Sequence, residues 1–385
     1  VFEYSPIMYG RNIFGWNESN HTDIPLVMFY DLNSWADSDL GILTSITYHL
    51  IFSNEDSRVG IGLSDMMLSW GRTTDIEWVY EIILDENEMI ISEIFQGASH
   101  TPTAFEGQKY GNHPILINAT PNCNFDDNGI SDYKFFLSPN NIPSDEHTRE
   151  YLMDMNPWTY KIMGEELLNE SKYEDIQDPA YWELSDVRNY LYIEYDGFST
   201  GSNIECNIKA TFYNDCYKYS NNHNDPEILA SFGNGVQRTA IELPENFNVG
   251  GLQYLHLNST GNSEYSITLN EIKSIFTLSN NYEPLEIEIE TINNPITLNN
   301  SSPDASIIIN EGTLGFDCTG IFDGEAFCDV CDICSEGNTE ITADADLDDC
   351  GVCFGVNQDM DCNGVCFGES YLDDCYVCDD DSLND

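Results

Sequence analysis

The stretch NYLYIEYDGFSTGSNIECNIKATFYNDC, residues 189–216, sets the expected fold class. It contains two runs in which apolar and polar residues alternate, Asn189–Tyr195 and Asn203–Tyr213, joined by a connection rich in glycine and serine. Such alternation predicts strands with one buried face, and the polar connection predicts that they pair as a hairpin. One face of the first strand then carries Leu191, Ile193 and Tyr195.

The same pattern extends through the N-terminal part of the chain, Val1–Asn248. ILTSITYHLIFSNED and TDIEWVYEIILDENEMIISEIFQ predict strands joined by acidic turns. A helical insertion is expected at about 145–172, where Ser144 is a candidate cap and Pro157 interrupts the helical run. A shorter helix is expected at 225–232.

Two further zones follow. Residues 249–316 contain short β-rich runs separated by Asn, Ser and Pro, which predicts a second, small β-sandwich. Residues 317–385 form a tail rich in cysteine and aspartate. The expected fold is therefore mainly β: a β-sandwich or jelly-roll-like domain with a few helices over 1–248, the small sandwich, and a tail of disulfide-rich, EGF-like repeats.

The charge of the chain excludes several partners. Thirteen Lys and Arg face 68 Asp and Glu, which gives a formal net charge of -55. Such a chain repels the phosphates of nucleic acids and anionic lipid surfaces. No run approaches the 18 apolar residues of a membrane span, so we expect no nucleic acid partner and no direct membrane insertion. The acidity serves either a highly soluble surface or the binding of multivalent cations.

Cysteines are concentrated in the tail. A segment with so many cysteines and so few apolar residues is typical of secreted proteins, in which disulfides replace a core. Structural zinc and a redox C-x-x-C pair are the alternatives, but the neighbouring aspartates oppose thiolate formation. We therefore expect disulfides that link one module to another and do not close a single C-x-x-C. The cysteines concerned are Cys318, Cys328, Cys331, Cys334, Cys350, Cys353, Cys362, Cys366, Cys375 and Cys378.

The tail contains an internal repeat. A shift of 44 residues superposes Cys318, Gly320, Gly324, Glu325, Cys331 and Cys334 on Cys362, Gly364, Gly368, Glu369, Cys375 and Cys378. If the ten tail cysteines pair among themselves, three body cysteines remain, Cys123, Cys206 and Cys216. One of these is then left over, as a covalent link to a second subunit or as a buried thiol, unless a body cysteine pairs with the tail.

One segment has the spacing of a calcium loop. In NFDDNGISD, the oxygen-bearing residues Asn124, Asp126, Asn128 and Asp132 occupy loop positions 1, 3, 5 and 9, with a glycine at position 6. Position 12 is Phe135, so the bidentate glutamate of an EF-hand is absent. The segment is either a calcium site, which makes calcium the expected metal cofactor, or an Asn/Asp/Gly-rich turn that binds nothing.

Catalytic motifs are absent from the sequence. It contains no H-E-x-x-H, no G-x-S-x-G and no phosphate-binding loop, and its seven histidines are scattered. His100 and His113 flank a loop beside a predicted strand, and this loop is the one place where we would look for a catalytic site. We expect no enzyme and assign no catalytic residue.

Seven N-glycosylation sequons are present, about the number that chance predicts for so many asparagines. In a secreted eukaryotic protein several should carry N-linked glycans. They are Asn17, Asn20, Asn118, Asn169, Asn258, Asn299 and Asn300.

The stretches LDDCGVCFG and DCNGVCFGESYLDDCYVC resemble the DDCGVCGG-type repeats of large secreted and cell-surface proteins. They look most like those of tubular flagellar hair (mastigoneme) proteins of stramenopiles, in which a β-rich body is joined to EGF-like repeats. Phe354 and Tyr376 stand where such repeats often have glycine. In the body, YSPIMYG, TTDIEWVYEI and HPILINAT follow the order seen in proteins similar to the Vps62 type, which implies an all-β body without established catalytic residues.

The resemblance implies a structural subunit of an extracellular filament or surface appendage that polymerises with itself and with other filament subunits. The alternative is a secreted, calcium-dependent carbohydrate-binding protein or hydrolase on a cysteine-rich stalk. The chain begins at Val1 without a signal peptide, so we expect a processed form that is secreted, at the cell surface or on a flagellar appendage.

Overall fold

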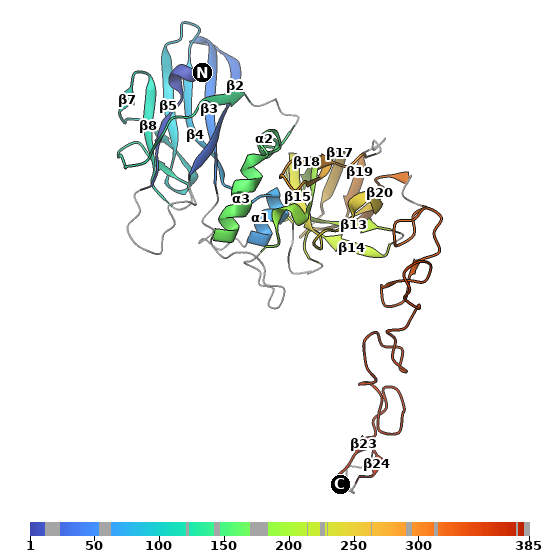
Figure 1. Cartoon of the computed structure of the whole chain (residues 1–385). Coiled ribbons are helices and arrows are strands. Elements are labelled where there is room, and N and C mark those ends of the chain that lie inside the picture. The colour runs from blue at the N-terminus through green and yellow to red at the C-terminus, as the bar shows by residue number, and fades with distance from the viewer. Residues whose placement is uncertain are drawn as a thin grey trace.

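The computed structural model describes residues 1–11, 24–53, 63–120, 123–141, 147–169, 184–213, 215–223, 228, 230–262, 264–289, 295–311, 315–374 and 376–380. Two β-sandwiches lie on either side of a small group of helices, and a long stalk runs from the second sandwich to the C-terminus (Figure 1). The fold is mainly β, with several antiparallel sheets, few helices and a disulfide-rich C-terminal region, as the sequence predicts.

The first sandwich is built on a long, mostly antiparallel sheet. The order of this sheet is β11-β2-β3-β4-β5-β6. It comprises β2 (Pro25–Asp37), β3 (Gly41–Phe52), β4 (Ile76–Leu84), β5 (Ile90–Gly97), β6 (Thr101–Ala104) and β11 (Pro139–Asn141). The facing sheet has the order β10-β1-β8-β7, with β9 paired to β8. It comprises β1 (Ile7–Tyr9), β7 (Lys109–Tyr110), β8 (His113–Asn118), β9 (Phe125–Asp126) and β10 (Lys134–Phe135).

Alternate residues of β3 fill the core between these sheets. Tyr48, Leu50 and Phe52 are almost completely buried there, together with Met8 from β1 and Leu116 from β8. Large aromatic and aliphatic side chains at every second position hold a strand against a facing sheet, because each successive residue points to the opposite side.

Three helices lie between the sandwiches: α1 (Leu63–Trp70), α2 (Tyr151–Met155) and α3 (Trp158–Asn169). The interruption between α2 and α3 falls at Pro157, as expected, because proline removes a helical hydrogen bond. The helix α1 has no counterpart in the sequence-based expectation. One apolar cluster joins the two sandwiches through the helices, since Phe29 of β2, Met163 of α3 and Tyr192 of the second sandwich all contribute to it.

A buried charge network reinforces this junction. The guanidinium of Arg238 contacts Asp154 of α2 at 2.6 Å and Glu194 at 2.8 Å, and Arg238 and Glu194 are almost fully buried. His147 lies 2.9 Å from the same Glu194 carboxylate. Buried charges are tolerated only where they are paired, so these contacts fix the second sandwich to the helices in one arrangement.

The second sandwich has two antiparallel sheets. The orders are β15-β12-β17-β18, with β19 also on β17, and β14-β13-β16-β20. The strands are β12 (Tyr190–Thr200), β13 (Glu205–Phe212), β14 (Tyr217–Ser220), β15 (Gly235–Glu242), β16 (Leu252–Thr260), β17 (Ser266–Leu278), β18 (Pro284–Glu286), β19 (Ile296–Asn299) and β20 (Asp304–Ile308). Leu191, Ile193 and Tyr195 share the core between them, as predicted.

The expected hairpin over residues 189–213 is wrong in one respect. The two strands exist as β12 and β13, but they lie in opposite sheets, because β12 pairs with β15 and β17 whereas β13 pairs with β14 and β16. The connection therefore crosses the sandwich. The reason is burial of both faces of β12: Tyr190 and Tyr192 pack into the cluster around the helices, opposite Leu191.

The division at residue 248 does not separate two cores. Strands before and after it share both sheets of the second sandwich, since β12 pairs with β17 and β13 pairs with β16. The second sandwich instead takes in about residues 184–311. Of the short helix expected at 225–232, residues 225–227 and 229 lie outside the described residues; residues 228 and 230–232 are not helical, and Ser231 forms a β-bridge with Glu205.

Candidate functional site

The stalk, residues 315–374 and 376–380, is held together by a ladder of disulfides. Two-residue strand pairs, β21 (Phe327–Cys328) with β22 (Cys334–Ser335) and β23 (Tyr371–Leu372) with β24 (Cys378–Asp379), are its regular elements. The bonds within it are Cys318–Cys334, Cys331–Cys353, Cys350–Cys366 and Cys362–Cys378. None of them closes a C-x-x-C pair, as predicted. Cys331–Cys353 and Cys350–Cys366 link each copy of the repeat to the unit between them, whereas Cys318–Cys334 and Cys362–Cys378 lie within one copy, so the expectation of links between modules holds for two of the four bonds. Cys375 lies outside the described residues.

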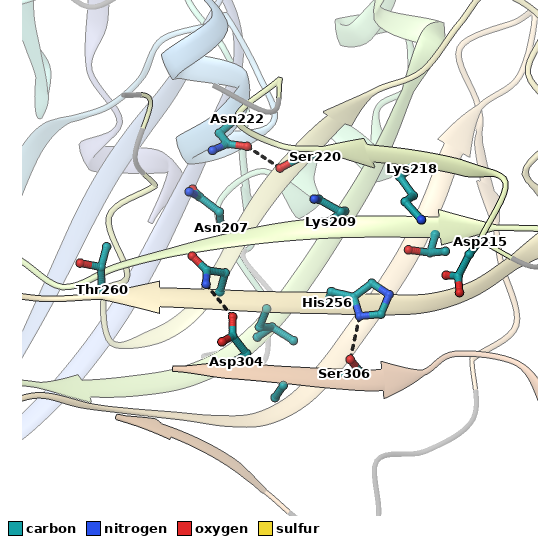
Figure 2. A pocket seen from close by; sticks show the side chains of 14 residues that line it. Asn207, Lys209, Asp215, Lys218, Ser220, Asn222, His256, Thr260, Asp304 and Ser306 are labelled. Atoms are coloured by element: carbon teal, nitrogen blue, oxygen red, sulfur yellow. Dashed lines mark hydrogen bonds between the residues drawn. The ribbon is translucent and has the colours of Figure 1, made fainter. Parts of the chain in front are cut away.

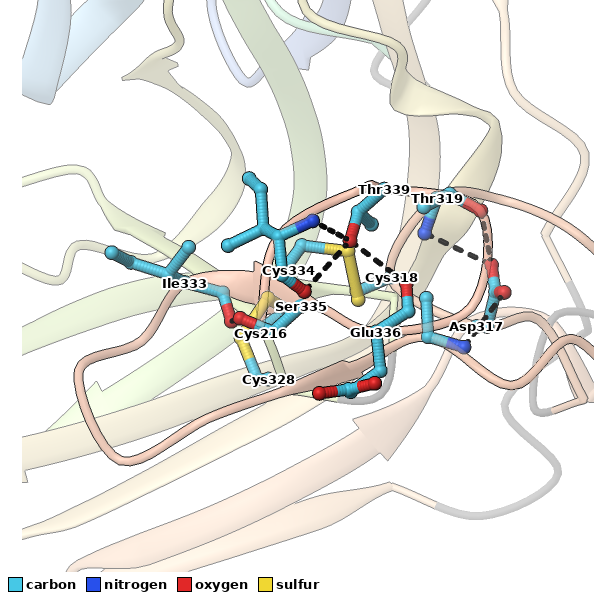
Figure 3. The surroundings of a disulfide bond; sticks show 12 residues. Cys216, Asp317, Cys318, Thr319, Cys328, Ile333, Cys334, Ser335, Glu336 and Thr339 are labelled. Atoms are coloured by element: carbon cyan, nitrogen blue, oxygen red, sulfur yellow. Dashed lines mark hydrogen bonds between the residues drawn. A yellow bond between two sulfur atoms is a disulfide. The ribbon is translucent and has the colours of Figure 1, made fainter. Parts of the chain in front are cut away.

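A fifth disulfide ties the stalk to the second sandwich. Cys216, in the turn before β14, is bonded to Cys328, and this bond and Cys318–Cys334 lie close together at the stalk's base (Figure 3). The tail cysteines therefore do not pair only among themselves, and the third possibility for the body cysteines, a bond to the tail, is realised. Five disulfides indicate an oxidising environment.

Five aspartates of the stalk share one local structure. In each module the aspartate N–H donates to the carbonyl four residues later, and the N–H three residues later donates to the aspartate carbonyl. The carboxylate also accepts the N–H four residues later. These residues are Asp317, Asp329, Asp348, Asp361 and Asp373. They are turn-forming groups whose carboxylates are engaged by the backbone, which distinguishes them from simple solvated charge.

The residue three positions after each aspartate has a positive φ, with values between 56° and 82°. Glycine, which adopts this conformation without strain, fills three of the five positions: Gly320, Gly351 and Gly364. The DDCG sequence of the repeat thus has a structural cause: the aspartate forms the turn, and the glycine adopts its positive φ. The carboxylates stabilise the turns, and hydrogen bonds from backbone N–H groups lower the pKa of Asp348 and Asp361 below the usual value.

Large aromatic residues occupy one of these five positions, at Tyr376, and two further positive-φ positions of the stalk, at Phe354 and Phe367. Phe354 has φ 56° and is 63% exposed, Phe367 has φ 55° and is 68% exposed, and Tyr376 has φ 64° and is 84% exposed. In each of the three, the backbone is strained and the ring is exposed to water. Packing within the chain offsets neither the strain nor the exposure. Such residues are candidates for contact with another molecule.

A groove of about 720 Å³, lined mostly by residues with polar side chains, lies on the outer face of the sheet β14-β13-β16-β20 (Figure 2). Register places Lys209 of β13 directly opposite His256 of β16, and His256 opposite Ser306 of β20. One step along the strands, Asn207, Asn258 and Asp304 form a second row. The full lining is Asn207, Lys209, Thr211, Asp215, Lys218, Ser220, Asn222, His256, Leu257, Asn258, Thr260, Asp304, Ala305 and Ser306.

Hydrogen bonds fix several of these side chains. His256 Nδ1 lies 2.7 Å from Ser306 Oγ, and Asn258 Nδ2 donates to Asp304 Oδ1 at 2.6 Å (Figure 2). Thr211 is fully buried, and its hydroxyl has no hydrogen-bond partner among the described residues. The groove therefore presents preset hydroxyl, amide and imidazole groups, and one buried hydroxyl beneath it has no partner among the described residues.

The groove also contains two ammonium groups without an ion pair. Within the described residues, no carboxylate lies within 4.0 Å of Lys209 or Lys218. Burial lowers the pKa of His256 most, and the two lysines lower it further while Asp215 opposes them. Among the described lysines and arginines, six others do pair with carboxylates: Arg72, Lys109, Lys161, Arg188, Arg238 and Lys273. Unpaired cations in so acidic a protein make the groove a candidate site for an anionic ligand.

The groove was missed by sequence reasoning, although a signal for it exists. Alternate positions of β13, occupied by Asn207, Lys209 and Thr211, are polar, and so are His256 and Asn258 in β16. The pattern identifies an exposed sheet face, but only strand pairing shows that these two runs are neighbours.

The residues of the predicted calcium loop are only partly brought together. Asn124 is buried, and its Oδ1 accepts the His100 N–H at 3.4 Å, whereas Asp126 is exposed and accepts the Asn128 N–H at 2.8 Å. Asp132 is also exposed. Among the described residues, no group of three or more His, Cys, Asp or Glu is arranged to hold a metal. Calcium at this loop stays a prediction.

His100 and His113 have different surroundings. His100 Nδ1 lies 3.2 Å from Gln96 Nε2 and 3.5 Å from a Glu77 carboxylate oxygen. His113 Nδ1 lies 2.9 Å from the Ser5 carbonyl, and its ring packs edge-on against Phe136. The two histidines flanking the loop thus have separate partners.

The sequons differ in accessibility. Asn118 is only 2% exposed, whereas Asn169, Asn258 and Asn300 are exposed and Asn299 is half-buried. Asn17 and Asn20 lie outside the described residues. A glycan at Asn118 would require the end of β8 to open, because its side chain points into the protein.

The other two body cysteines are buried and are not in disulfides. Cys123 is 0% exposed and Cys206 is 3% exposed, and burial raises the pKa of the Cys206 thiol to about 12. A thiol that is buried and protonated reacts slowly with a partner's cysteine. This environment favours buried thiols over covalent links at these two positions.

Comparisons with protein-family models, with curated proteins and with solved structures found no match to this chain. In the part of the chain that the structure describes, no helix is long and apolar enough to cross a bilayer. The function therefore has to be argued from the stalk and the groove.

Proposed function

We propose that this chain is a structural subunit of an extracellular filament or surface appendage, of the kind that the stalk's resemblance to mastigoneme repeats implies. The stalk carries the argument. It contains almost no apolar core, and its shape is held by successive disulfides and aspartate turns. Such a segment serves as a spacer or connector that resists pulling.

The junction between stalk and body supports the same function. Cys216–Cys328 anchors the base of the stalk covalently, so that a load on the stalk passes into the sheet that contains β13 and β14. The buried Arg238 network then couples that sandwich to the helices and the first sandwich. A protein that only displays a soluble binding domain does not need both connections.

The second candidate is a secreted carbohydrate-binding protein, and the groove favours it. Its hydroxyl, amide and carboxylate groups are those that bind sugar hydroxyls. However, its lining includes no Phe, Tyr or Trp on which a sugar ring could stack. We therefore place this function second.

Sedimentation of the purified, oxidised protein separates the two functions. A filament subunit forms large polymers as concentration rises, and pelleting them with intact disulfides is the expected result. A monomer at every concentration that binds neutral oligosaccharides in a glycan-array assay would contradict the structural function and support the second candidate.

A further inference from the structure

The two unpaired lysines identify what the groove can hold. Lys209 and Lys218 lie on neighbouring strands, beside the imidazole of His256, and no carboxylate of the described residues lies within 4.0 Å of either, although Asp215 and Asp304 also line the groove. In a protein of net charge -55, a groove in which two lysines balance two aspartates is less negative than the chain as a whole. A ligand with several carboxylates binds most favourably there, because the rest of the acidic surface repels it.

The chain itself contains an occupant of that chemistry. Residues 317–385 contain 20 Asp and Glu and neither Lys nor Arg. Within the stalk, Asp348 and Asp361 are engaged in turns, but others, such as Asp359 and Asp374, are exposed. The described part of the stalk thus offers exposed carboxylates in more than one of its modules.

The stalk also carries apolar side chains that its own fold does not use. Phe354 and Phe367 are exposed, and each adopts the left-handed conformation at a position where glycine would be less strained. Strain and exposure together point to an intermolecular contact for these rings.

Geometry excludes the stalk of the same molecule. The base of the stalk is attached at Cys216, next to Asp215 on the groove's rim, and from there the stalk runs away from both sandwiches (Figure 1). We propose that the groove receives the acidic stalk of a second copy of this chain, so that subunits associate head to tail. The contact is heterologous, because groove and stalk are different surfaces, and repetition of such a contact produces an open filament. This inference rests on the proposed function and names its interface.

Charge reversal in the groove tests the contact. Full-length Lys209→Glu/Lys218→Glu should need at least about tenfold more protein to form polymers than the wild type, and wild-type assembly should weaken with added salt. The matched control, Lys161→Glu/Lys273→Glu, makes the same charge change at surface ion pairs and should assemble as the wild type does. Wild-type and groove variants that polymerise equally would overturn the inference while leaving the filament function intact.

A second variant separates docking from folding. Phe354→Gly/Phe367→Gly removes both rings and relieves backbone strain, so the stalk should remain folded and its disulfides intact. Loss of assembly from this variant supports docking, and unchanged assembly contradicts it. A wild-type protein that never polymerises overturns the proposed function itself, and the inference with it.

The same samples also test whether the groove binds an anionic polysaccharide in place of a second stalk. Dextran sulfate serves as a probe for an anionic polysaccharide. If the groove variant loses dextran sulfate binding but assembles normally, the groove belongs to a sulfated glycan and the head-to-tail contact is contradicted.

Discussion

Cys216, just after the end of β13, is bonded to Cys328, 112 residues later, and this disulfide fixes the base of the stalk on the second sandwich. The neighbouring residue Asp215 lines the groove. The anchor therefore adjoins one end of the groove, and the stalk leaves the second sandwich from that end.

Removing this anchor should free the stalk's base. Closing a loop of this length stabilises the folded state by roughly 4–5 kcal/mol in the chain-entropy account. We expect Cys216→Ser/Cys328→Ser to melt at a lower temperature and to be cut by protease between the sandwich and the stalk. Calorimetry and limited proteolysis measure both effects. Cys362→Ser/Cys378→Ser is the control, because it opens only a distal module, and equal melting of both variants with no new cleavage would contradict the anchor's role.

The stalk turns should loosen in acid. The folded-state pKa of Asp348 is lowered by hydrogen bonds from the N–H groups of Val352, Asn357 and Cys350. A depressed folded pKa stabilises the turn above the unfolded pKa, and this contribution is lost as pH falls below about 4 through the folded pKa. Amide exchange at Val352 should therefore accelerate in that range.

The variant Asp348→Ala should show fast Val352 exchange already at pH 7. Asp359→Ala, which removes an exposed carboxylate from the same stalk, should not. Exchange at Val352 that is independent of pH and of Asp348 would show that the disulfides alone hold the turn.

The buried network should be costly to break. Arg238→Met leaves Glu194 without its main partner in a buried site, which should destabilise the protein by about 3–5 kcal/mol. Arg188→Met removes an ion pair that is partly exposed and should cost about 1 kcal/mol or less. Chemical denaturation of the two variants gives the comparison, and similar midpoints would show that Arg238 does not hold the sandwiches together.

The two buried body thiols should be protected. Because Cys123 and Cys206 are buried, an alkylating reagent should label neither in the native protein and both after denaturation. Peptide mapping by mass spectrometry reads each site separately. Either residue found in a disulfide to another subunit would contradict the assignment of buried thiols.

Glycan occupancy should follow exposure and docking. We expect Asn118 to be unmodified, because its side chain is buried, and Asn169 to be accessible. Asn258 lies within the groove, so head-to-tail docking requires it to be unmodified in assembled protein. Glycopeptide analysis of native material tests these sites, and a glycan at Asn258 of assembled subunits would conflict with a stalk in the groove.

Local patterns predicted much of the fold. Alternation identified β12 and β13 and the face that carries Leu191 and Ile193, and the cysteine density predicted disulfides that close no C-x-x-C pair. Sheet membership was not predictable, because alternation is the same whether a strand pairs with its successor or crosses to the facing sheet. Both faces of β12 are buried, and only the helices beneath Tyr192 explain this.

The candidate site was less predictable for the same reason. Cys216 and Cys328 come together only through the folding of the intervening sandwich, and the spacing of cysteines does not encode such a pair. Likewise, Lys209 and His256 become neighbours through strand register. The aspartate turns could have been found, since Asp348 and Asp361 each precede a glycine by three residues, a pattern typical of tight turns.

Electron microscopy of the native secreted material tests the central claim most directly. With antibodies against the body and the stalk, negative-stain images should show filaments in which both antigens recur at regular intervals along the axis. Separate head-and-stalk particles carrying each antigen once, with no filaments at any protein concentration, would contradict the account.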